Sequence, residues 1–334
     1  MMILCLFVLF SVGAAIFILL TSIINFATRL QLSLERPIPV TLEDFESLSP
    51  PASPSIQDPS SKSLSIIIPA FNEQDRLGAT LDEAMNYLQQ RRNVSGPHFT
   101  YEVIVVDDGS RDETVRLAAG YVQRYGFDAV RVLKSSRNMG KGHAVRRGCL
   151  CSRGEVVLFM DADGATRISD LEKLECALRK LTEEKSAETH QGVVFGSRSH
   201  LERAAMAQRS ALRNILTKGF HLLVTLVAGS KIRDTQCGFK LFSRKAALLL
   251  FGNQRLQRWC FDVELLHLAE QFEIPVSEVS VRWTEMPGSK IRFTSILHMA
   301  FELLTIKICY QVLGLWKVYS EPELRELISL AIMN

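Results

Sequence analysis

The chain has 334 residues, and 47% of them are hydrophobic, which allows a sizeable core in one large domain or two smaller ones. The formal net charge of only +3 argues against a nucleic-acid-binding protein, which normally carries a strong basic excess. The seven cysteines are scattered and odd in number, so we predict neither a zinc site nor a disulfide framework, and a reducing compartment is favoured.

The first predicted element is an apolar helix over residues 2–28, a stretch without any charged side chain. It exceeds the roughly 20 apolar residues that a helix needs to span a bilayer. A cleaved signal peptide is the alternative, but its apolar region would be shorter and preceded by a basic residue. The first basic residues, Arg29 and Arg36, follow the stretch, which predicts a single-pass anchor with the next domain in the cytosol.

A linker is predicted over residues 29–63, which are rich in proline and serine and show no periodicity. From residue 64 onward, buried strands alternate with amphipathic helices. The strands are predicted in LSIIIPAFNE, YEVIVVDDGS, VRVLK and EVVLFMDADG, and helices in TLDEAMNYLQQRR, in TVRLAAGYVQRYG and after NMGKG. Continuous apolar strands that alternate with helices predict an α/β fold, with a mostly parallel sheet covered on both faces.

Acidic residues follow three of these predicted strands. They are Glu73 after the first strand, Asp107 and Asp108 after the second, and Asp161 and Asp163 after the fourth. Parallel sheets bind ligands at the carboxyl ends of their strands, so these side chains should share one edge. Clustered carboxylates are costly unless a cation lies between them, and Mg²⁺ and Mn²⁺ prefer oxygen ligands. A divalent-metal site is therefore predicted there, against the alternative of ordinary solvated turns.

Several stretches together resemble the nucleotide-sugar half of the family 2 glycosyltransferases, which have the GT-A fold. In chain order these stretches are SIIIPAFNE, VIVVDDGSRDET, NMGKGHAVRRG and LFMDADG. Farther along, GVVFGSR, DTQCGFKLF and RWCFDVELL resemble the dolichyl-phosphate sugar synthases. The resemblance implies a GT-A domain over residues 64–290. The chain after it, residues 291–334, is predicted to form amphipathic helices near the membrane.

The resemblance implies a divalent metal, Mg²⁺ or Mn²⁺, that Asp161 and Asp163 hold on the diphosphate of a sugar nucleotide. Gln236 is implied as a third metal ligand. Such a metal offsets the charge that develops on the leaving nucleotide, so both aspartates would take part in catalysis.

The resemblance implies that the first loops of the domain bind the donor nucleotide. The implied residues are Pro69, Phe71 and Glu73 in the first loop, and Asp107 or Asp108, with Asp108 favoured for the base. An aspartate can accept from uracil N3–H and equally from guanine N1–H, so this pair leaves UDP and GDP both open. Lys141 lies in a glycine-rich loop before a helix, where it would add positive charge near a phosphate. Close packing of that helix, which the glycines would permit, is the alternative.

The acceptor implied by the resemblance is a lipid phosphate, which needs guanidinium groups for its phosphate. Arg198 follows the Gly-Ser of the motif, and Arg209 and Arg213 are four residues apart and so share a helix face. Solvated surface charges are the alternative for each arginine. Asp234 and Asp262 are candidates for a general base, although an anionic phosphate needs no strong base.

The C-terminal stretch 288–320 is apolar but interrupted by His298, Glu302 and Lys307, so we do not expect it to span a bilayer. A helix at the membrane surface is favoured because a lipid acceptor must be reached, and Trp316 and Tyr319 suit such an interface. A helix that caps the sheet is the alternative.

The sequence thus predicts a membrane-anchored glycosyltransferase of the endoplasmic reticulum that faces the cytosol. By the resemblance, it moves glucose from UDP-glucose to dolichyl phosphate with inversion, for assembly of the N-glycan precursor. Transfer of mannose from GDP-mannose is the nearest alternative. A glycosyltransferase with a protein or polysaccharide acceptor and a non-catalytic membrane scaffold with the GT-A fold are the others.

Overall fold

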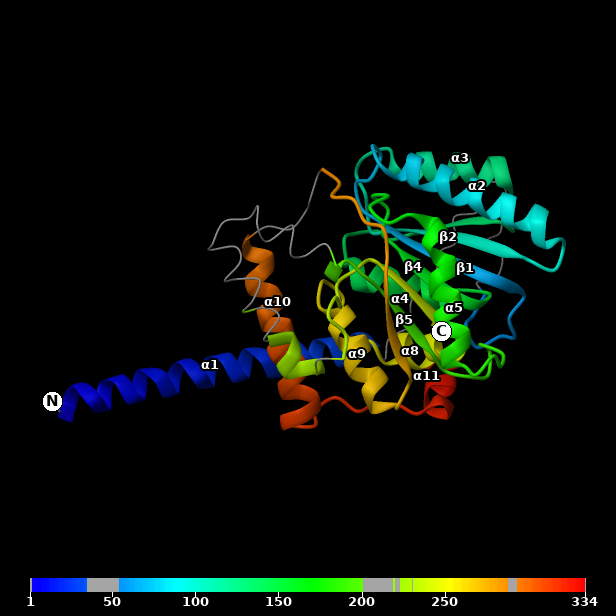
Figure 1. Cartoon of the computed structure of the whole chain (residues 1–334). Coiled ribbons are helices and arrows are strands. Elements are labelled where there is room, and N and C mark those ends of the chain that lie inside the picture. The colour runs from blue at the N-terminus through cyan, green and yellow to red at the C-terminus, as the bar shows by residue number, and fades with distance from the viewer. Residues whose placement is uncertain are drawn as a thin grey trace.

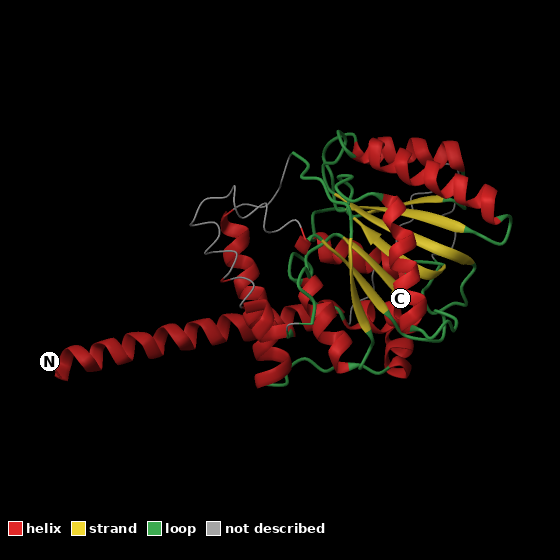
Figure 2. Ribbon diagram, in the orientation of Figure 1, coloured by secondary structure: helices red, strands yellow, loops and turns green. Residues whose placement is uncertain are grey.

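The computed structural model describes residues 2–34, 54–200, 219, 223–229, 231–287 and 293–333. Within them, a seven-stranded sheet lies between two layers of helices (Figure 1; Figure 2). The strands are β1 (Lys62–Ala70), β2 (Tyr101–Asp107), β3 (Val130–Lys134), β4 (Gly154–Met160), β5 (Val193–Ser197), β6 (Phe239–Ser243) and β7 (Val276–Ser280). Their order across the sheet is β3-β2-β1-β4-β6-β5-β7.

Most strand pairs are parallel, as the sequence predicts. Strands β3, β2, β1 and β4 form a continuous parallel half, and β5 pairs in parallel with β7. Strand β6 is antiparallel to both of its neighbours, β4 and β5. The predicted class, a mostly parallel α/β sheet flanked by helices, is therefore confirmed, with one reversed strand.

Alternation along the strands divides the core into two layers. In β1, Ile66 and Ile68 face one layer while Ile67 faces the other, and all three are fully buried. The first layer contains α2 (Leu77–Ser95), α3 (Thr114–Tyr125), the short 3₁₀ helix η1 (Ile168–Asp170) and α5 (Leu171–Leu181); the second contains α4 (Lys141–Leu150), α8 (Arg244–Asn253) and α9 (Phe261–Gln271).

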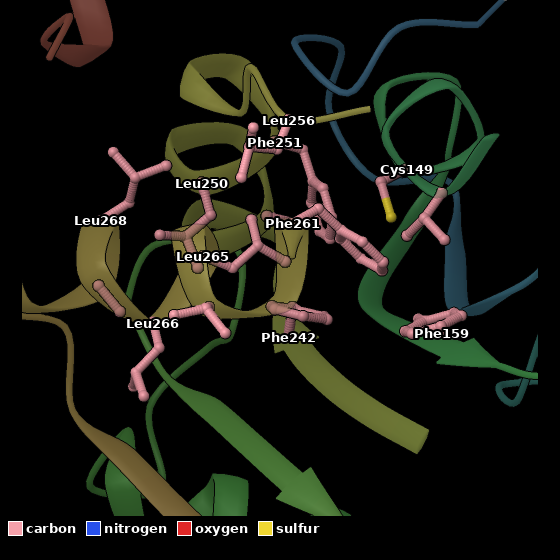
Figure 3. Packing of buried hydrophobic residues seen from close by; sticks show 14 of the residues in the cluster. Cys149, Phe159, Phe242, Leu250, Phe251, Leu256, Phe261, Leu265, Leu266 and Leu268 are labelled. Atoms are coloured by element: carbon pink, nitrogen blue, oxygen red, sulfur yellow. The ribbon is translucent and has the colours of Figure 1, made fainter. Parts of the chain in front are cut away.

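In the second layer, the Phe159 ring of β4 meets the Phe261 ring of α9 edge to face, with centroids 6.0 Å apart (Figure 3). Burying one such side chain contributes about 1.5–3 kcal/mol relative to leaving it exposed. Phe159 directly precedes Met160 and the two aspartates of the site, so this packing holds the end of β4 in place.

Helix α1 (Met2–Leu34) projects far from the domain at its N-terminal end (Figure 1). Among the described residues, its stretch Phe10–Leu34 is the one long and apolar enough to cross a membrane, judged by length and composition. The helix continues past residue 28 to Leu34, and Ile23, Ala27 and Leu30 are buried against the domain. An N-terminal apolar helix of this kind fits a membrane anchor.

Part of the predicted linker packs on the domain. Ile56 is buried, and its backbone N–H donates to the Leu150 carbonyl at 2.8 Å. Residues 35–53 lie outside the described residues.

The C-terminal elements are α10 (Phe293–Ile306), the π-helix η2 (Lys307–Val312) and α11 (Glu321–Met333). One face of α10 caps the domain through Leu303 and Ile306, while Leu297 and Leu304 on the same helix are exposed. Trp316, expected to suit a membrane interface, is instead buried, and its indole N–H donates to the Ala27 carbonyl of α1 at 3.2 Å.

Candidate active site

The predicted acidic residues do gather at one edge of the sheet. The carboxyl ends of β1 and β2 lie side by side, with Ala70 opposite Asp107. Because β6 is antiparallel to β4, the start of β6 lies at the end of β4, and the Asp161 N–H donates to the Gly238 carbonyl at 3.0 Å. The loop before β6 therefore joins the same edge, as does Arg198 after β5.

Asp161 forms an ion pair with Lys141. Its carboxylate lies 2.6 Å from the ammonium of Lys141, which also sits 5.3 Å from the centre of the Phe159 ring. On the other side, a Cβ added to Gly238 would lie 2.0 Å from Asp161 Oδ2. Only glycine at position 238 leaves room for this carboxylate. Gly238 stands inside the predicted DTQCGFKLF motif, but its role depends on the strand pairing.

Asp163 lies in a strongly anionic setting. Its Oδ1 accepts from the Ala165 N–H at 3.0 Å. Burial and the neighbouring Asp161 charge raise the pKa of Asp163, although Arg76 and Lys141 act in the opposite direction. A cation beside Asp163 would stabilise its ionised carboxylate, as a bound metal stabilises its ligands.

Lys240, which the sequence reading missed, forms a buried ion pair with Asp262. Its ammonium lies 2.7 Å from Asp262 Oδ1 and donates to the Cys237 carbonyl at 2.6 Å. Burial raises the pKa of Asp262, while the charges of Lys240 and Lys141 oppose that shift. A lysine inside the buried strand FKLFS was the available signal, since a fully buried lysine requires an anionic or carbonyl partner.

Two predicted residues, Arg198 and Asp234, pair with each other. The guanidinium donates to both carboxylate oxygens at 2.8 Å, and the Arg198 backbone N–H adds a third bond at 2.8 Å. Burial alone would raise the pKa of Asp234, but these bonds and the Arg198 charge hold it below its ordinary value. Arg198 also lies over the Trp283 ring, 5.4 Å from its centre. Arg209 and Arg213 lie outside the described residues.

In the predicted nucleotide loops, the aspartates bind backbone amides. Asp107 accepts from the N–H groups of Gly109 and Ser110, and Asp108 accepts from those of Met139 and Gly140, each of the latter two at 2.8 Å. Burial raises the pKa of both carboxyls. An ionised carboxylate offers about four acceptor sites, so these bonds leave lone pairs for a further donor.

The remaining residues of the first loop lie at the end of β1. Pro69 and Phe71 are half-buried, and Glu73 forms an ion pair with Arg76 at 2.7 Å.

The glycine-rich loop packs closely against Gln257 and Arg258. Gly140 has φ +113°, and a Cβ there would lie 2.4 Å from the Gln257 carbonyl oxygen. The N–H groups of Gly142 and His143 donate to the carbonyls of Arg258 and Gln257, at 3.1 and 2.9 Å. The N–H groups of the second and third residues of α4 are thus bonded to backbone carbonyls, which agrees with close packing of this helix. Positive charge reaches the site through the side chain of Lys141 instead.

The donor set suits a hard divalent cation. Within the described residues, no group of three or more His, Cys, Asp or Glu side chains gathers as a metal site. Asp161 and Asp163 supply two carboxylates, and Gln236, half-buried just before Gly238, lies in the neighbouring loop. Oxygen-only ligands of this kind fit Mg²⁺ or Mn²⁺, which normally complete their shells with phosphate oxygens and water.

Comparisons with known proteins identify relatives of this chain. Residues 65–250, more than half of the chain, match the family described as Glycosyl transferase family 2. The chain is 52% identical over 268 residues to a Drosophila melanogaster protein named dolichyl-phosphate beta-glucosyltransferase, covering 80% of this chain and 81% of that protein. Homo sapiens and Saccharomyces cerevisiae proteins of the same name are 48% and 38% identical, covering 79% and 78% of this chain and 81% and 78% of theirs.

Solved structures show weaker similarity. A glucosyl-3-phosphoglycerate synthase from Mycobacterium tuberculosis, crystallised with Mn²⁺ and UDP-glucose, is 17% identical with a TM-score of 0.47, covering 74% of this chain and 78% of that chain. A Pyrobaculum calidifontis mannosyltransferase with GDP-mannose and Mn²⁺ is 16% identical with a TM-score of 0.42, covering 94% and 88%. At these values, neither similarity bears on the donor or the metal of this chain.

Proposed function

The chain belongs to glycosyltransferase family 2, and we propose on that premise that it transfers glucose from UDP-glucose to dolichyl phosphate, forming dolichyl β-D-glucosyl phosphate. One observation carries this assignment: relatives named dolichyl-phosphate beta-glucosyltransferase are 38–52% identical over about four fifths of both chains. The chain is accordingly an enzyme, a hexosyltransferase.

Asp161 and Asp163, with Gln236 as a third ligand, would hold the divalent metal on the donor diphosphate. When bound, Mg²⁺ or Mn²⁺ supplies Lewis-acid stabilisation of the negative charge on departing UDP. Pro69, Phe71 and Glu73 would line the nucleotide together with Asp107 and Asp108. Lys141 adds a positive charge beside Asp161, where a diphosphate would lie.

In the proposed reaction, an oxygen of the dolichyl phosphate attacks the anomeric carbon of glucose from the face opposite UDP. The carbon–oxygen bond to UDP breaks as the new bond forms, so the configuration inverts. The acceptor oxygen is already anionic, and no proton has to be removed. The ion pairs of Asp234 with Arg198 and of Asp262 with Lys240 support a role in positioning charge for both former base candidates.

For the acceptor, Arg198 and, outside the described residues, Arg209 and Arg213 are the proposed phosphate ligands. Helix α1 would hold the enzyme in the membrane of the endoplasmic reticulum, with the catalytic domain in the cytosol and its product used for N-glycan precursor assembly. The exposed apolar surface of α1 supports insertion of this helix into a bilayer. The basic residues Arg29 and Arg36, which follow its apolar stretch, support the cytosolic side for the domain.

Radiolabel transfer in detergent tests the assignment, with dolichyl phosphate, Mg²⁺ and either UDP-glucose or GDP-mannose. We expect lipid-soluble label from UDP-glucose alone. Label from GDP-mannose alone would overturn the choice of sugar while keeping the fold. Label from neither donor would favour another acceptor or the non-catalytic scaffold.

A further inference from the structure

We infer that Lys141 is a built-in counter-ion of the metal site: without donor its ammonium holds the cation position at Asp161, and it leaves that position only when metal and sugar nucleotide bind together. This inference rests on the proposed function. Its basis is the 2.6 Å contact between the Lys141 ammonium and Asp161 Oδ1, on one of the two carboxylates that would bind the metal.

The surroundings of Asp161 bring the Lys141 ammonium and a metal into competition for its carboxylate. Its backbone N–H is bonded to the Gly238 carbonyl at 3.0 Å, and the space around Gly238 is so close to Asp161 Oδ2 that even a methyl group would clash. Gly238 therefore closes one side of the carboxylate. A metal that binds Asp161 Oδ1 must displace the ammonium, because two cations cannot share one oxygen at contact distance without strong repulsion.

Lys141, unlike its neighbour Lys240, is placed so that it can move. The Lys240 side chain is fully buried and bonded to both Asp262 and the Cys237 carbonyl. The Lys141 side chain is 26% exposed, and its ammonium contacts Asp161 and lies over the Phe159 ring. Lys141 is also the first residue of α4, whose next two N–H groups are tied to the carbonyls of Arg258 and Gln257. The backbone is thus fixed while the side chain is able to change partner.

The predicted consequence is an order of binding. Metal alone must break the ion pair of Lys141 with Asp161 and leave its ammonium with the weaker attraction of Asp262 and Asp163. Metal that arrives with a nucleoside diphosphate brings a new anion for the ammonium, so the exchange is electrically balanced. The free enzyme should therefore bind metal weakly, and the nucleotide should tighten metal binding strongly.

The test measures Mn²⁺ binding to the full-length enzyme in detergent by electron paramagnetic resonance, with no nucleotide and no acceptor. Lys141→Met removes the charge and keeps most of the side-chain length, and we expect it to bind Mn²⁺ at least about tenfold more tightly than wild type. Lys141→Arg keeps the charge and should bind as weakly as wild type. Lys173→Met is the matched control, because it removes a lysine paired with Asp170 at 2.9 Å on another part of the domain.

A second titration adds UDP. UDP should raise the Mn²⁺ affinity of wild type. In Lys141→Met the factor by which UDP raises this affinity should be at least about tenfold smaller, because the diphosphate has lost its ammonium partner. An unchanged Mn²⁺ affinity in folded Lys141→Met overturns the inference. The inference is also overturned if Lys141→Arg or Lys173→Met binds Mn²⁺ as tightly as Lys141→Met does. Lys141→Gln replaces Lys141→Met if the latter unfolds early in a thermal scan. The readout needs neither sugar nor lipid, so it stands even if the proposed donor or acceptor proves wrong.

Discussion

At the residue scale, the site consists of charges that are already paired within the protein. Asp161 pairs with Lys141, Asp234 with Arg198, and Asp262 with Lys240. These pairs differ in exposure, and only the lysine of the third is fully buried. Breaking a buried pair by removing one partner leaves the other charge without compensation, which typically costs about 3–5 kcal/mol.

Lys240→Met should therefore lower the free energy of unfolding by about 3–5 kcal/mol, since it leaves Asp262 buried beside a vacant ammonium site. Adding Asp262→Asn should restore part of that loss, because the uncompensated charge is removed as well. Urea unfolding of the two single variants and the double variant in detergent measures the coupling. Single-variant losses that simply add in the double variant would show that the pair is not coupled.

Asp163→Asn should reduce glucose transfer by at least about a hundredfold, because metal catalysis relies on several kcal/mol of charge stabilisation. Asparagine keeps the shape and can still accept the Ala165 N–H through its side-chain oxygen. Initial rates at saturating Mg²⁺ measure the effect, and an unchanged melting temperature serves as the folding control. Transfer at the wild-type rate would remove Asp163 from the metal site.

At the element scale, the last turns of α1 belong to the catalytic domain. Gln31 accepts from the Arg255 guanidinium at 2.8 Å, and the Ser33 hydroxyl accepts from the Gln257 side chain at 2.9 Å. The backbone carbonyl of the same Gln257 receives an N–H from the first turn of α4, next to Lys141. One short loop therefore connects the proposed anchor to the start of α4, where Lys141 contacts Asp161.

A chain that begins at residue 23 should stay folded and active in detergent, whereas one that begins at residue 35 should lose stability and transfer. The longer deletion removes the Gln31 partner of the buried Arg255 guanidinium and the Ser33 partner of Gln257, and a buried polar group left unsatisfied costs about 1–3 kcal/mol. Melting temperature and transfer rate of the two truncations measure the difference. Gln31→Ala in the full chain is the narrower control and should lower the melting temperature without changing membrane insertion. If the two truncations have the same melting temperature and transfer rate, the last turns of α1 do not stabilise the catalytic domain.

The elements also show what could be predicted from the sequence. The acidic edge was predictable, because buried strands such as VVLFM end directly in polar residues and parallel strands align their carboxyl ends. The roles of Gly238 and Lys240 were not, since both depend on β6 pairing antiparallel with β4, about 80 residues away. The bonds of Asp108 to the glycine loop were missed for another reason: a sequence pattern does not show which backbone amides a loop brings near.

At the scale of the whole molecule, exposed apolar side chains gather around the proposed anchor. Helix α10 and η2 lie beside α1 (Figure 1). Leu297 of α10 is 62% exposed, and Leu313 and Leu315 after η2 are 47% and 46% exposed. Val94 at the far end of α2 is also exposed, at 88%, but lies away from these elements. A bilayer that surrounds α1 would meet the first group and not Val94.

The double variant Leu313→Asp, Leu315→Asp should therefore weaken use of a membrane-bound acceptor. Two charges placed at the membrane surface oppose partition of this loop into the headgroup region, so we expect the apparent KM for dolichyl phosphate in vesicles to rise about fivefold or more. The KM for UDP-glucose should not change, because neither leucine contacts the edge of the sheet that carries Asp161. Val94→Asp, which adds a charge at an even more exposed position far from α1, should leave both constants at wild-type values. If the double variant also matches wild type, α1 alone brings the acceptor to the site, and the surface around η2 has no part in lipid delivery.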